Sequence, residues 1–531
     1  MPSADSPTRY ISTRAISTRE ISTRDISTGN SGPALDFAEV LLTGLAPDGG
    51  LYCPVEVPSL PDLTGSDGTY ADVARRVMWP FVEGSIEADR FVAMVTEAYA
   101  GFRDPAVCQV VELGENQYML DLSKGPTLAF KDVALQLVGR LLDHELSRRE
   151  EQVMVITATS GDTGSAAIEA LANRANLSAV VLHPHERVSE VQRMQMTTVD
   201  AANIHNLAVE GTFDDCQDLV KAAFLDHSIT AGVKPAAVNS INWARVMAQI
   251  VYYVTSSRTV APDGGPVSYS VPTGNFGNVL AGWYAKSMGV VIDQLVVASN
   301  RNDVLTRFFE TGELSVREVQ PSLSPSMDIQ VSSNFERLLW EASGRDGAAV
   351  AELIGEFRST GQVKVPEPWV KEIRSEFAAT RVDDDETLAE IARVHGDLGL
   401  LVDPHTAVAL VAARRMRRDP AVPMITLATA DPAKFPDAVE KATGVRPPLP
   451  SFLSELLDRP EHYEVVANIP ERLQHLAEKE PYASFVPEAV LYVSSPRPDQ
   501  RQPAPDELEL AGRRFVPAFT TERIEILLPE D

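Results

Sequence analysis

A chain of 531 residues with 44% hydrophobic and 23% charged side chains has a globular composition and, at roughly 150 residues per domain, room for about three domains. Its formal net charge of −28 argues against nucleic acid and anionic membranes as partners, because polyanions bind basic surfaces. Its three cysteines lack the spacing of a disulfide framework or a zinc site, and no long apolar run suggests a leader or a membrane span. We therefore expect a cytoplasmic protein that acts on a small molecule without a bound metal.

The N-terminal segment contains a short repeat. The triplet Ile-Ser-Thr starts at Ile11, Ile16, Ile21 and Ile26, and an arginine follows the first three copies. A period of five residues fits neither a strand nor a helix, so the array cannot present one continuous apolar face. We therefore predict a disordered arm over residues 1–32, with a partner-binding tail as the alternative.

The next segment has helical patterns. A short amphipathic helix is predicted from Phe37 to about Gly44, before a turn at residues 47–50. A second helical region is predicted from Tyr70 to about Gly101. Together these patterns predict a small N-terminal helical domain over residues 33–104.

Strand-like and helical patterns alternate between about Val107 and Ala430. This alternation is typical of an α/β fold, because parallel strands need helical crossovers. The length of the region predicts two doubly wound α/β lobes over residues 105–450. Beyond them, residues 451–531 are predicted to be a C-terminal extension, to which the sequence assigns no role.

The stretch SKGPTLAFKDVALQLVG, residues 123–139, places a lysine at the start of an apolar helix. A turn at residues 125–127 precedes the helix, so Lys131 is expected in the first helical turn. The helix dipole and partial burial both disfavour the ammonium, which lowers the pKa of the amine and makes it nucleophilic. Such an amine is suited to a Schiff base with an aldehyde cofactor, although a lysine at this place is more often a solvated side chain.

Three further stretches place polar groups where a predicted strand ends. In VPTGNFGNVL, two glycines precede a helix, so that backbone amides and the helix dipole could hold a phosphate, or the stretch could be a plain tight turn. In ATSGDTGSAA, hydroxyls and amides could hold a carboxylate if Asp162 is turned away or paired, and otherwise Asp162 would cap the helix. Thr429 ends the run MITLAT, at the sheet edge where ligands of open α/β folds bind.

An amine and a phosphate-binding turn at the carboxyl ends of predicted strands are together what pyridoxal phosphate requires. The stretches GPTLAFKD, TSGDTGSAA, DDCQDLVKAAF, NSINWAR, VPTGNFGN and LATADPAKF follow GLAPDGGLYCP at the head of the chain. They resemble the threonine synthase family of fold-type-II pyridoxal-phosphate enzymes, and residues 10–14 resemble its usual opening. The resemblance covers residues 10–444 and implies that residues 33–104 are the N-terminal domain of that family and residues 105–450 its catalytic region.

The resemblance also implies roles for individual residues. Lys131 would form the Schiff base with pyridoxal phosphate, and Thr429 would hydrogen-bond to the pyridine nitrogen. The cofactor phosphate would be held by Gly274, Asn275, Phe276, Gly277 and Asn278. The substrate would be bound by Ser160, Asp162, Thr163, Asn239, Ser240, Asn242 and Arg245. Arg245 is suited to a bidentate contact with the substrate phosphate, the alternative being a surface arginine on a helix.

The implied reaction converts O-phospho-L-homoserine and water to L-threonine and phosphate, the last step of threonine biosynthesis, with Lys131 as nucleophile and proton carrier. Two alternatives stay open: a related enzyme that acts on another β- or γ-substituted amino acid, and a non-catalytic binding protein on the same scaffold. His405 in DPHTA is predicted to be structural rather than a base, and Lys124 to be a solvated loop residue rather than a phosphate ligand. The sequence leaves the oligomeric state open.

Overall fold

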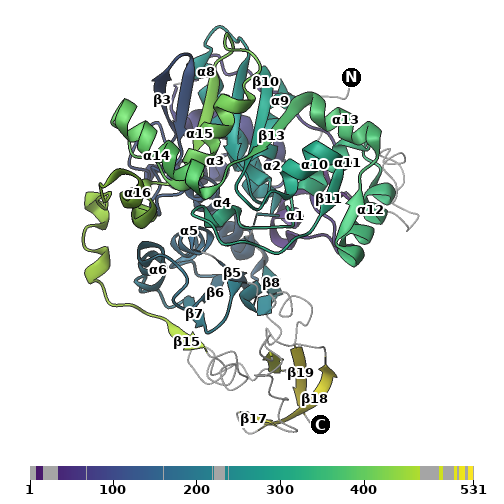
Figure 1. The fold of residues 1–531 in the computed structure, drawn as a ribbon. Helices are drawn as coiled ribbons and strands as arrows, with labels where there is room; N and C mark the ends of the chain where they lie inside the picture. Colours follow the sequence, from purple (N-terminus) through teal and green to yellow (C-terminus); the bar gives the residue numbers. More distant parts are fainter. Residues whose placement is uncertain are drawn as a thin grey trace. The chain divides into compact units, whose positions relative to one another are not determined.

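The computed structural model describes residues 7–15, 34–66, 68–159, 161–213, 215–217, 219–220, 238 and 240–466. For the strands at residues 234–236, 490–493, 508–510, 513–520 and 524–529 only the backbone is described. The chain divides into two compact units (Figure 1). Unit 1 is made of Met1–Leu142 and Val238–Ser454, and unit 2 of Asp143–Ala237 and Glu455–Asp531.

Unit 1 contains a six-stranded sheet. In spatial order its strands are β13 (Phe377–Arg381), β10 (Ile292–Ser299), β9 (Val267–Pro272), β14 (Met424–Ala428), β4 (Gln117–Asp121) and β3 (Gln109–Gly114). All neighbours are parallel except β3, which pairs antiparallel with β4 at the edge. Every residue of the central strands β9 and β14 is buried, as expected for parallel strands covered on both faces.

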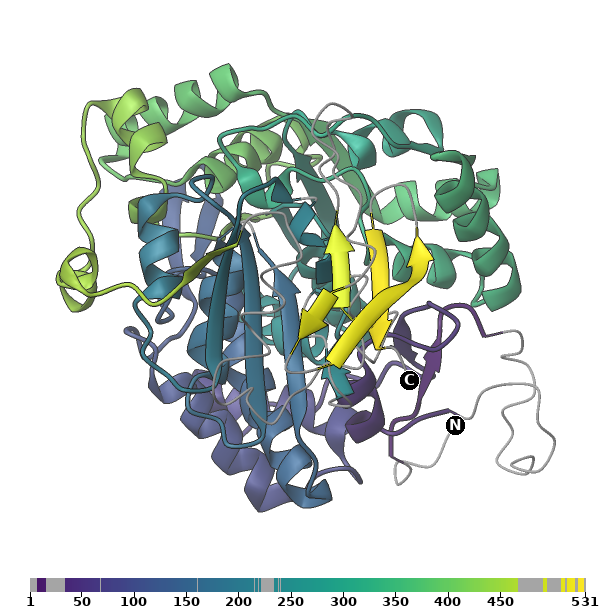
Figure 2. The ribbon, with the colours of Figure 1, turned by 90° about the horizontal axis from the view of Figure 1, so that it is seen from below.

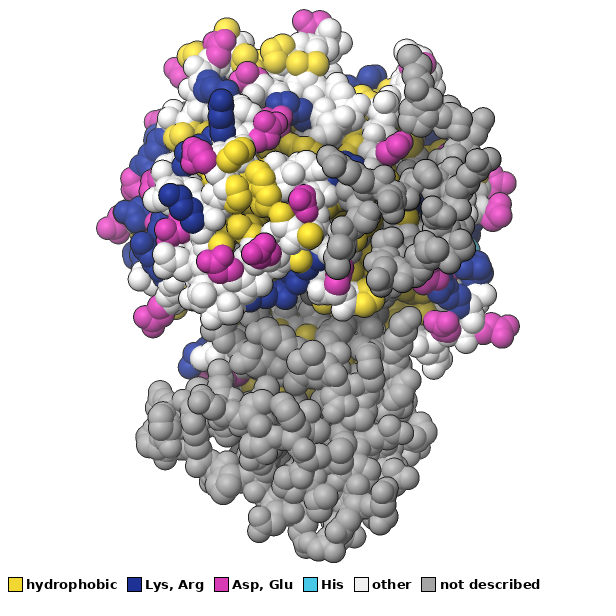
Figure 3. Space-filling view, turned by 90° about the vertical axis from the view of Figure 1, so that its right-hand side faces the viewer, with side chains coloured by type: hydrophobic (Ala, Val, Ile, Leu, Met, Phe, Trp, Pro, Cys, Tyr) yellow, Lys and Arg dark blue, Asp and Glu magenta, His cyan; other side chains and the backbone are white. Residues whose placement is uncertain are grey.

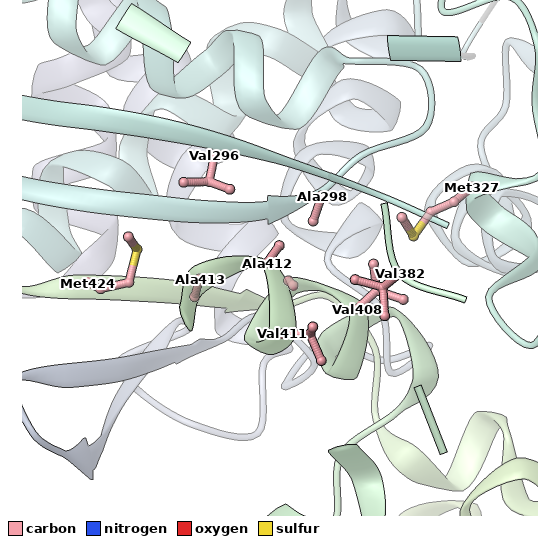
Figure 4. Packing of buried hydrophobic residues seen from close by; sticks show 10 residues of the cluster. Val296, Ala298, Met327, Val382, Val408, Val411, Ala412, Ala413 and Met424 are labelled. Atoms are coloured by element: carbon pink, nitrogen blue, oxygen red, sulfur yellow. The ribbon is translucent and has the colours of Figure 1, made fainter. Parts of the chain in front are cut away.

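Unit 1 also contains the helices α4 (Lys131–Arg149), which continues into unit 2, α8 (Trp243–Val260), α9 (Gly277–Met288), α10 (Val304–Thr311), α11 (Phe335–Ala342), α12 (Gly347–Thr360), α13 (Glu367–Glu376), α14 (Asp384–Leu398), α15 (Pro404–Met416) and α16 (Pro436–Thr443). Helices α8, α9, α10, α13 and α15 contact strands of the sheet. Helix α15 packs on β9, β10 and β14. Its Val408 and Ala412 lie in one apolar cluster with Val296 and Ala298 of β10 and with Met424 of β14 (Figure 4). This core fixes α15 against the central strands.

Helices α1 (Phe37–Thr43), α2 (Tyr70–Val82) and α3 (Ala88–Ala100) form the predicted N-terminal helical region. The Asp36 carboxylate accepts from the Glu39 amide at 3.0 Å and so caps α1, and Thr69 caps α2 in the same way. Helix α2 packs against α8, so this region belongs to the same compact unit as the six-stranded sheet. A two-stranded sheet of β11 (Glu313–Ser315) and β12 (Gln362–Lys364) joins α10 and α12.

The first copy of the repeat is ordered. Residues 7–15, which we predicted to lie in a disordered arm, contain β1 (Tyr10–Ser12), and this strand pairs antiparallel with β2 (Tyr52–Pro54). Tyr10 is fully buried and donates from its hydroxyl to the Phe81 carbonyl at 2.8 Å. The rest of the predicted arm, residues 1–6 and 16–32, lies outside the described residues.

Polar contacts explain why the fivefold period did not predict this order. Thr13 donates to the Glu336 carboxylate at 2.7 Å, and the Arg14 guanidinium donates two hydrogen bonds to the same carboxylate. A single copy of the repeat is therefore held by hydrogen bonds and one aromatic anchor, so it needs no continuous apolar face.

Unit 2 contains a five-stranded, all-parallel sheet. In spatial order its strands are β15 (Glu464–Val466), β7 (Ile204–Val209), β6 (Leu177–Pro184), β5 (Val153–Ala158) and β8 (Lys234–Ala236). Figure 2 shows these strands side by side. Helices α5 (Asp162–Leu171) and α6 (Glu190–Thr197) pack on one face of β6 through Ile168, Met196 and Val181. The prediction of two α/β lobes is confirmed by the two sheets.

The predicted C-terminal extension begins with two short 3₁₀ turns, η3 (Ser451–Leu453) and η4 (Leu456–Asp458), and then supplies β15 to the sheet of unit 2. Arg193 of α6 forms an ion pair with Glu461 just before that strand. Further on, β16 (Val490–Val493), β17 (Leu508–Leu510), β18 (Arg513–Thr520) and β19 (Ile524–Pro529) form an antiparallel sheet in the order β16-β19-β18-β17.

On the face of the molecule drawn in Figure 3, basic and acidic side chains lie interspersed around small apolar areas. The net negative charge therefore does not produce a uniform acidic surface on this face. Among the helices that the structure describes, none is both long enough and apolar enough to cross a membrane.

Candidate active site

Lys131 is the first residue of α4, so its predicted place in the first helical turn is confirmed. The residue is 7% exposed, and its Nζ lies 4.9 Å from the centroid of the Phe130 ring. The amine is thus held inside the protein at the positive end of the helix dipole. Both conditions make an ammonium less favourable there than in water.

The turn that precedes α4 is fixed by several contacts. Leu128 adopts a left-handed conformation with φ of 64°. The Asp132 carboxylate accepts from the amide and the hydroxyl of Thr127 at 2.8 and 2.6 Å, and the buried Lys434 Nζ donates to the Thr127 carbonyl at 2.8 Å. At Gly125 an added Cβ would lie 2.4 Å from the Asp132 side chain, so only glycine fits. A strained residue held by so many contacts is typical of a functional turn.

The same turn determines where Thr429 lies. The amide of Phe130 donates to the Thr429 carbonyl at 2.9 Å, and the amide of Asp431 donates to the Leu128 carbonyl at 3.0 Å. Thr429, at the end of β14, is therefore adjacent to the residue that precedes Lys131. It is buried, and no described residue hydrogen-bonds to its hydroxyl.

A segment that the sequence did not single out contacts Lys131. The 3₁₀ turn η1 (Pro325–Met327) places the Ser326 Oγ 3.4 Å from the Lys131 Nζ, which donates to it. The Ser326 amide donates to His405 Nε2 at 3.2 Å, and His405 Nδ1 lies 2.7 Å from Asp403 Oδ2. A row of contacts thus leads from Asp403 through His405 and Ser326 to the Lys131 amine.

The turn between β9 and α9 is the predicted phosphate site. Phe276 lies in it at φ of 66°, with its ring buried against Phe335 and Phe377. At Gly274 an added Cβ would lie 2.7 Å from the Ser326 carbonyl oxygen, so the turn and η1 pack backbone against backbone. This close approach requires glycine.

Side chains brace this turn through its carbonyl groups and leave its amides available. Ser332 donates to the Gly274 carbonyl at 2.7 Å, and Asn334 donates to the Asn275 carbonyl from its amide at 3.1 Å and its side chain at 3.0 Å. No described residue accepts from the amides of residues 275–278, and α9 has no side-chain N-cap. Unpaired amides at a helix N-terminus are suited to an anion.

Asn278, the second residue of α9, adds another donor. Its Oδ1 accepts from the hydroxyls of Tyr252 and Tyr253 at 2.5 and 3.0 Å. Its Nδ2 is buried and has no partner within the described part of the chain. Because buried donors are nearly always paired, this nitrogen also points to a ligand.

The NSINWAR stretch leads into α8. Ser240 lies behind the α9 turn, since its carbonyl accepts from Asn334 Nδ2 at 3.0 Å. Asn242 caps α8 by accepting from the Ala244 amide at 3.0 Å, and its Nδ2 donates to the Leu41 carbonyl at 2.9 Å. These two bonds give Asn242 a structural role; its predicted substrate contact stays a prediction. Asn239 lies outside the described residues.

Arg245 is buried in α8 rather than exposed on its surface. Its Nη1 donates to the Val238 carbonyl at 3.0 Å, and its Nε has no partner among the described residues. Burial lowers the pKa of the guanidinium to about 10, because the charged form loses hydration. A buried cation without a described carboxylate partner favours an anionic ligand.

In unit 2, the predicted carboxylate-binding turn links β5 to α5. The Thr159 hydroxyl accepts from the amides of Gly161 and Gly164 at 3.0 and 2.7 Å, so Thr159 closes the turn. Asp162 is buried in the first turn of α5, and its Oδ1 accepts from Gln192 Nε2 at 2.8 Å. The carboxylate is therefore paired, which is the condition under which the turn could hold an anion.

The structure says less about the other two residues of this turn that were predicted to bind the substrate. Thr163 is half-buried in α5, whereas Ser160 lies outside the described residues. The helix cap is Gly161, which makes no side-chain cap bond, so Asp162 does not have the capping role that was its alternative.

Comparisons with known proteins agree with this architecture. Three family models match the chain: "Threonine synthase N terminus" at residues 21–99, "Pyridoxal-phosphate dependent enzyme" at residues 110–355 and "Threonine synthase, C-terminal" at residues 406–478. A threonine synthase from Pseudomonas aeruginosa is 51% identical over 82% of this chain and 94% of its own length. One from Corynebacterium glutamicum is 43% identical over 80% and 91%.

Solved structures give the same result. The pyridoxal-phosphate-bound threonine synthase from Brucella melitensis has a TM-score of 0.82 and 46% identity, covering 88% of this chain and 99% of that one. The yeast enzyme has a TM-score of 0.81 and 35% identity, covering 90% and 99%. Fold and matches together define a fold-type-II enzyme whose cofactor is pyridoxal phosphate. Within that class, the chain belongs to the threonine synthase family.

Proposed function

We propose that this protein is a threonine synthase, a carbon–oxygen lyase that converts O-phospho-L-homoserine and water to L-threonine and phosphate. The observation that carries the proposal is the buried Lys131 amine at the start of α4, in the same unit as a turn whose amides have no described acceptor. The 40% to 51% identity to relatives named threonine synthase supports this choice of substrate.

The residues of unit 1 suit pyridoxal phosphate. The Lys131 amine would bind its aldehyde, the amides of residues 275–278 with the unpaired Asn278 Nδ2 would bind its phosphate, and the Thr429 hydroxyl would bind its pyridine nitrogen. When bound, the cofactor supplies an electron sink that acidifies the carbon-bound protons of an amino acid. The neutral Thr429 hydroxyl would leave the pyridine nitrogen largely unprotonated and so limit that sink.

Lys131 would also move protons. Its neutral amine, held away from water, can accept the proton from the substrate Cα at Nζ and return it later in the reaction. Burial and the positive end of the α4 dipole both oppose a charge on this amine.

Arg245 would bind the substrate phosphate. Its buried guanidinium has no described carboxylate partner, and a phosphate would satisfy it through two parallel hydrogen bonds. Ser240 and Asn239 precede it in the same stretch and would contribute further polar contacts.

The turn in unit 2 would bind the substrate carboxylate through Ser160 and Thr163. The Asp162 carboxylate, which would repel that group if unpaired, already accepts from Gln192. Its charge is therefore partly neutralised by a hydrogen bond before a substrate arrives.

The decisive experiment incubates the purified protein and pyridoxal phosphate with O-phospho-L-homoserine and measures threonine and phosphate together. Equal amounts of both products are expected. Lys131→Ala should lower kcat by about 10²- to 10⁴-fold with an unchanged circular dichroism spectrum, because nucleophile and proton carrier are lost together. Lys371→Ala is the matched control: Lys371 is an exposed lysine of α13, so turnover should stay near that of the wild type.

Two results would contradict the proposal. Preferred turnover of phosphoserine or O-acetylserine would indicate the related enzyme with another substrate. Failure to develop the visible absorbance of bound cofactor would indicate the non-catalytic binding protein. The cytoplasmic location stays a prediction from the sequence.

A further inference from the structure

The row of contacts that ends at Lys131 begins at a rigid helix cap. Asp403 is fully buried and caps α15, accepting from the amides of His405 and Thr406 at 3.0 and 3.1 Å. The same carboxylate lies 2.7 Å from Nδ1 of the His405 ring, which is 3% exposed and packs edge-on against Phe435. The ring of His405 therefore has one orientation.

The backbone determines which nitrogen of His405 carries the proton. The Ser326 amide can only donate, so Nε2, 3.2 Å away, must accept and is unprotonated. Nδ1 then carries the proton and donates to Asp403. His405 is thus a neutral acceptor for a backbone amide and has no ring nitrogen left to act as a base.

The turn around Ser326 is held on its other side as well. The Asp328 carboxylate accepts from Asn300 and Asn302 at 2.7 and 2.9 Å and from the Ser322 amide at 2.9 Å. Met327 packs into the apolar cluster of β10 and α15 that Figure 4 shows. Contacts on both sides therefore fix the backbone that carries the Ser326 hydroxyl.

We propose that Ser326 is a further catalytic residue: its hydroxyl oxygen accepts a hydrogen bond from Lys131 Nζ and so helps to orient the amine toward the cofactor aldehyde. His405 and Asp403 are positioning residues, which act through the Ser326 amide. The inference rests on the proposed function only where turnover is the readout. Capture of pyridoxal phosphate by Lys131 tests it independently of any substrate.

The first test measures how fast the cofactor-free protein captures pyridoxal phosphate, followed by absorbance. Ser326→Ala should slow capture by about tenfold while the final bound amount stays the same, because an amine without a fixed orientation attacks less often. Ser324→Ala is the matched control, since the Ser324 hydroxyl accepts from Asn300 at 3.0 Å and is two residues away in the same turn. It should capture the cofactor at about the wild-type rate. Wild-type capture by Ser326→Ala would overturn the proposal.

The second test concerns His405. His405→Phe keeps an aromatic ring against Phe435 but removes the acceptor, and it should slow capture as much as Ser326→Ala. His405→Gln keeps an acceptor at the distance of Nε2 and should restore most of the rate. The double variant Ser326→Ala/His405→Phe should be no slower than Ser326→Ala alone, because both changes act through one hydroxyl. Additive slowing would overturn the positioning role.

A third readout needs no cofactor. The ¹⁵N shifts of the His405 ring in the cofactor-free protein should show Nδ1 protonated and Nε2 unprotonated, and an Nε2–H ring would overturn the inference. The two proposals fail separately. Slowed capture by Ser326→Ala with no turnover of O-phospho-L-homoserine by the wild type refutes the function alone, whereas normal capture with normal turnover refutes the role of Ser326 alone.

Discussion

Two turns of the molecule have similar sequences and differ in how they use their backbone. Each follows a strand, contains two glycines and opens a helix: the turn before α9 in unit 1 and the turn before α5 in unit 2. Before α9, Ser332 and Asn334 hydrogen-bond to carbonyl groups and leave the amides available. Before α5, the Thr159 hydroxyl accepts from two of the amides.

The difference indicates different ligands. Free amides at a helix N-terminus can surround a dianion such as a phosphate without a basic side chain. A turn in which one hydroxyl already accepts from two of the amides has fewer amides left for a ligand, and its side-chain hydroxyls suit a smaller monoanion such as a carboxylate. Glycine content alone therefore does not identify a phosphate site. A turn is suited to phosphate when its stabilising hydrogen bonds go to its carbonyl groups and leave its amides available.

Among the changes that test this comparison of the two turns, Gly274→Ala should have the largest effect. The added Cβ would lie 2.7 Å from the Ser326 carbonyl oxygen, and both partners are backbone, so the turn must shift. A cost of about 1–3 kcal/mol predicts a rise of about 5- to 150-fold in the Kd for pyridoxal phosphate, measured by titration of the cofactor-free protein. Gly355→Ala in α12 is the control, because an added Cβ there meets open space. An unchanged affinity for pyridoxal phosphate in Gly274→Ala would contradict the assignment of the turn before α9 to the cofactor phosphate.

Gly161→Ala should act on the other turn. Gly161 has φ of 131° and an added Cβ would lie 2.6 Å from the Gln192 side chain. A strain of about 1–3 kcal/mol should lower kcat/KM by about tenfold or more. The affinity for pyridoxal phosphate should stay unchanged. A loss of cofactor affinity as large as that in Gly274→Ala would show that the two turns do not differ in ligand.

Thr159→Val should have a smaller effect. The substitution keeps the shape of the side chain but removes the acceptor of two amides, as in the loss of a helix cap, at a cost of about 0.5–2 kcal/mol. Amide hydrogen exchange in α5 should become faster, with exchange in α9 unaltered. Equal acceleration in both helices would contradict the expectation.

The smallest effect is expected outside both turns. Tyr10→Phe removes one hydrogen bond to the Phe81 carbonyl and should cost about 0.5–1.5 kcal/mol. Faster exchange of the β1–β2 pair should reveal the loss, whereas cofactor affinity and kcat should be those of the wild type. A change in either would indicate that the first copy of the repeat supports the site.

Much of the fold could be predicted because it depends on local patterns. Alternating strand and helix periods predicted the two α/β lobes, and the apolar face behind Lys131 predicted its place in the first turn of α4. Contacts between residues far apart in the sequence leave no local pattern from which they could be predicted. The hydrogen bond between Lys131 and Ser326 joins residues 195 positions apart, and the one between Ser326 and His405 joins residues 79 positions apart.

Sequence patterns also left the surroundings of single residues open where packing decides. Arg245 could have been a surface residue, and only its position in α8 shows that it is buried and lacks a described carboxylate. Asn242 caps α8, and its assignment to the substrate by resemblance stays a prediction. A cap and a ligand contact use the same polar atoms, so the residue type cannot distinguish them.

The sequence by itself determined the fold class, the lysine at the helix start and the glycines of both turns, because periodicity and turn chemistry act over a few neighbouring residues. The resemblance of its longer motifs indicated the family. The tertiary structure alone decided which amides stay unpaired, which serine contacts the Lys131 amine and which tautomer His405 adopts. These properties depend on where hydrogen-bond partners from distant segments meet, and packing rather than any local pattern brings those segments together.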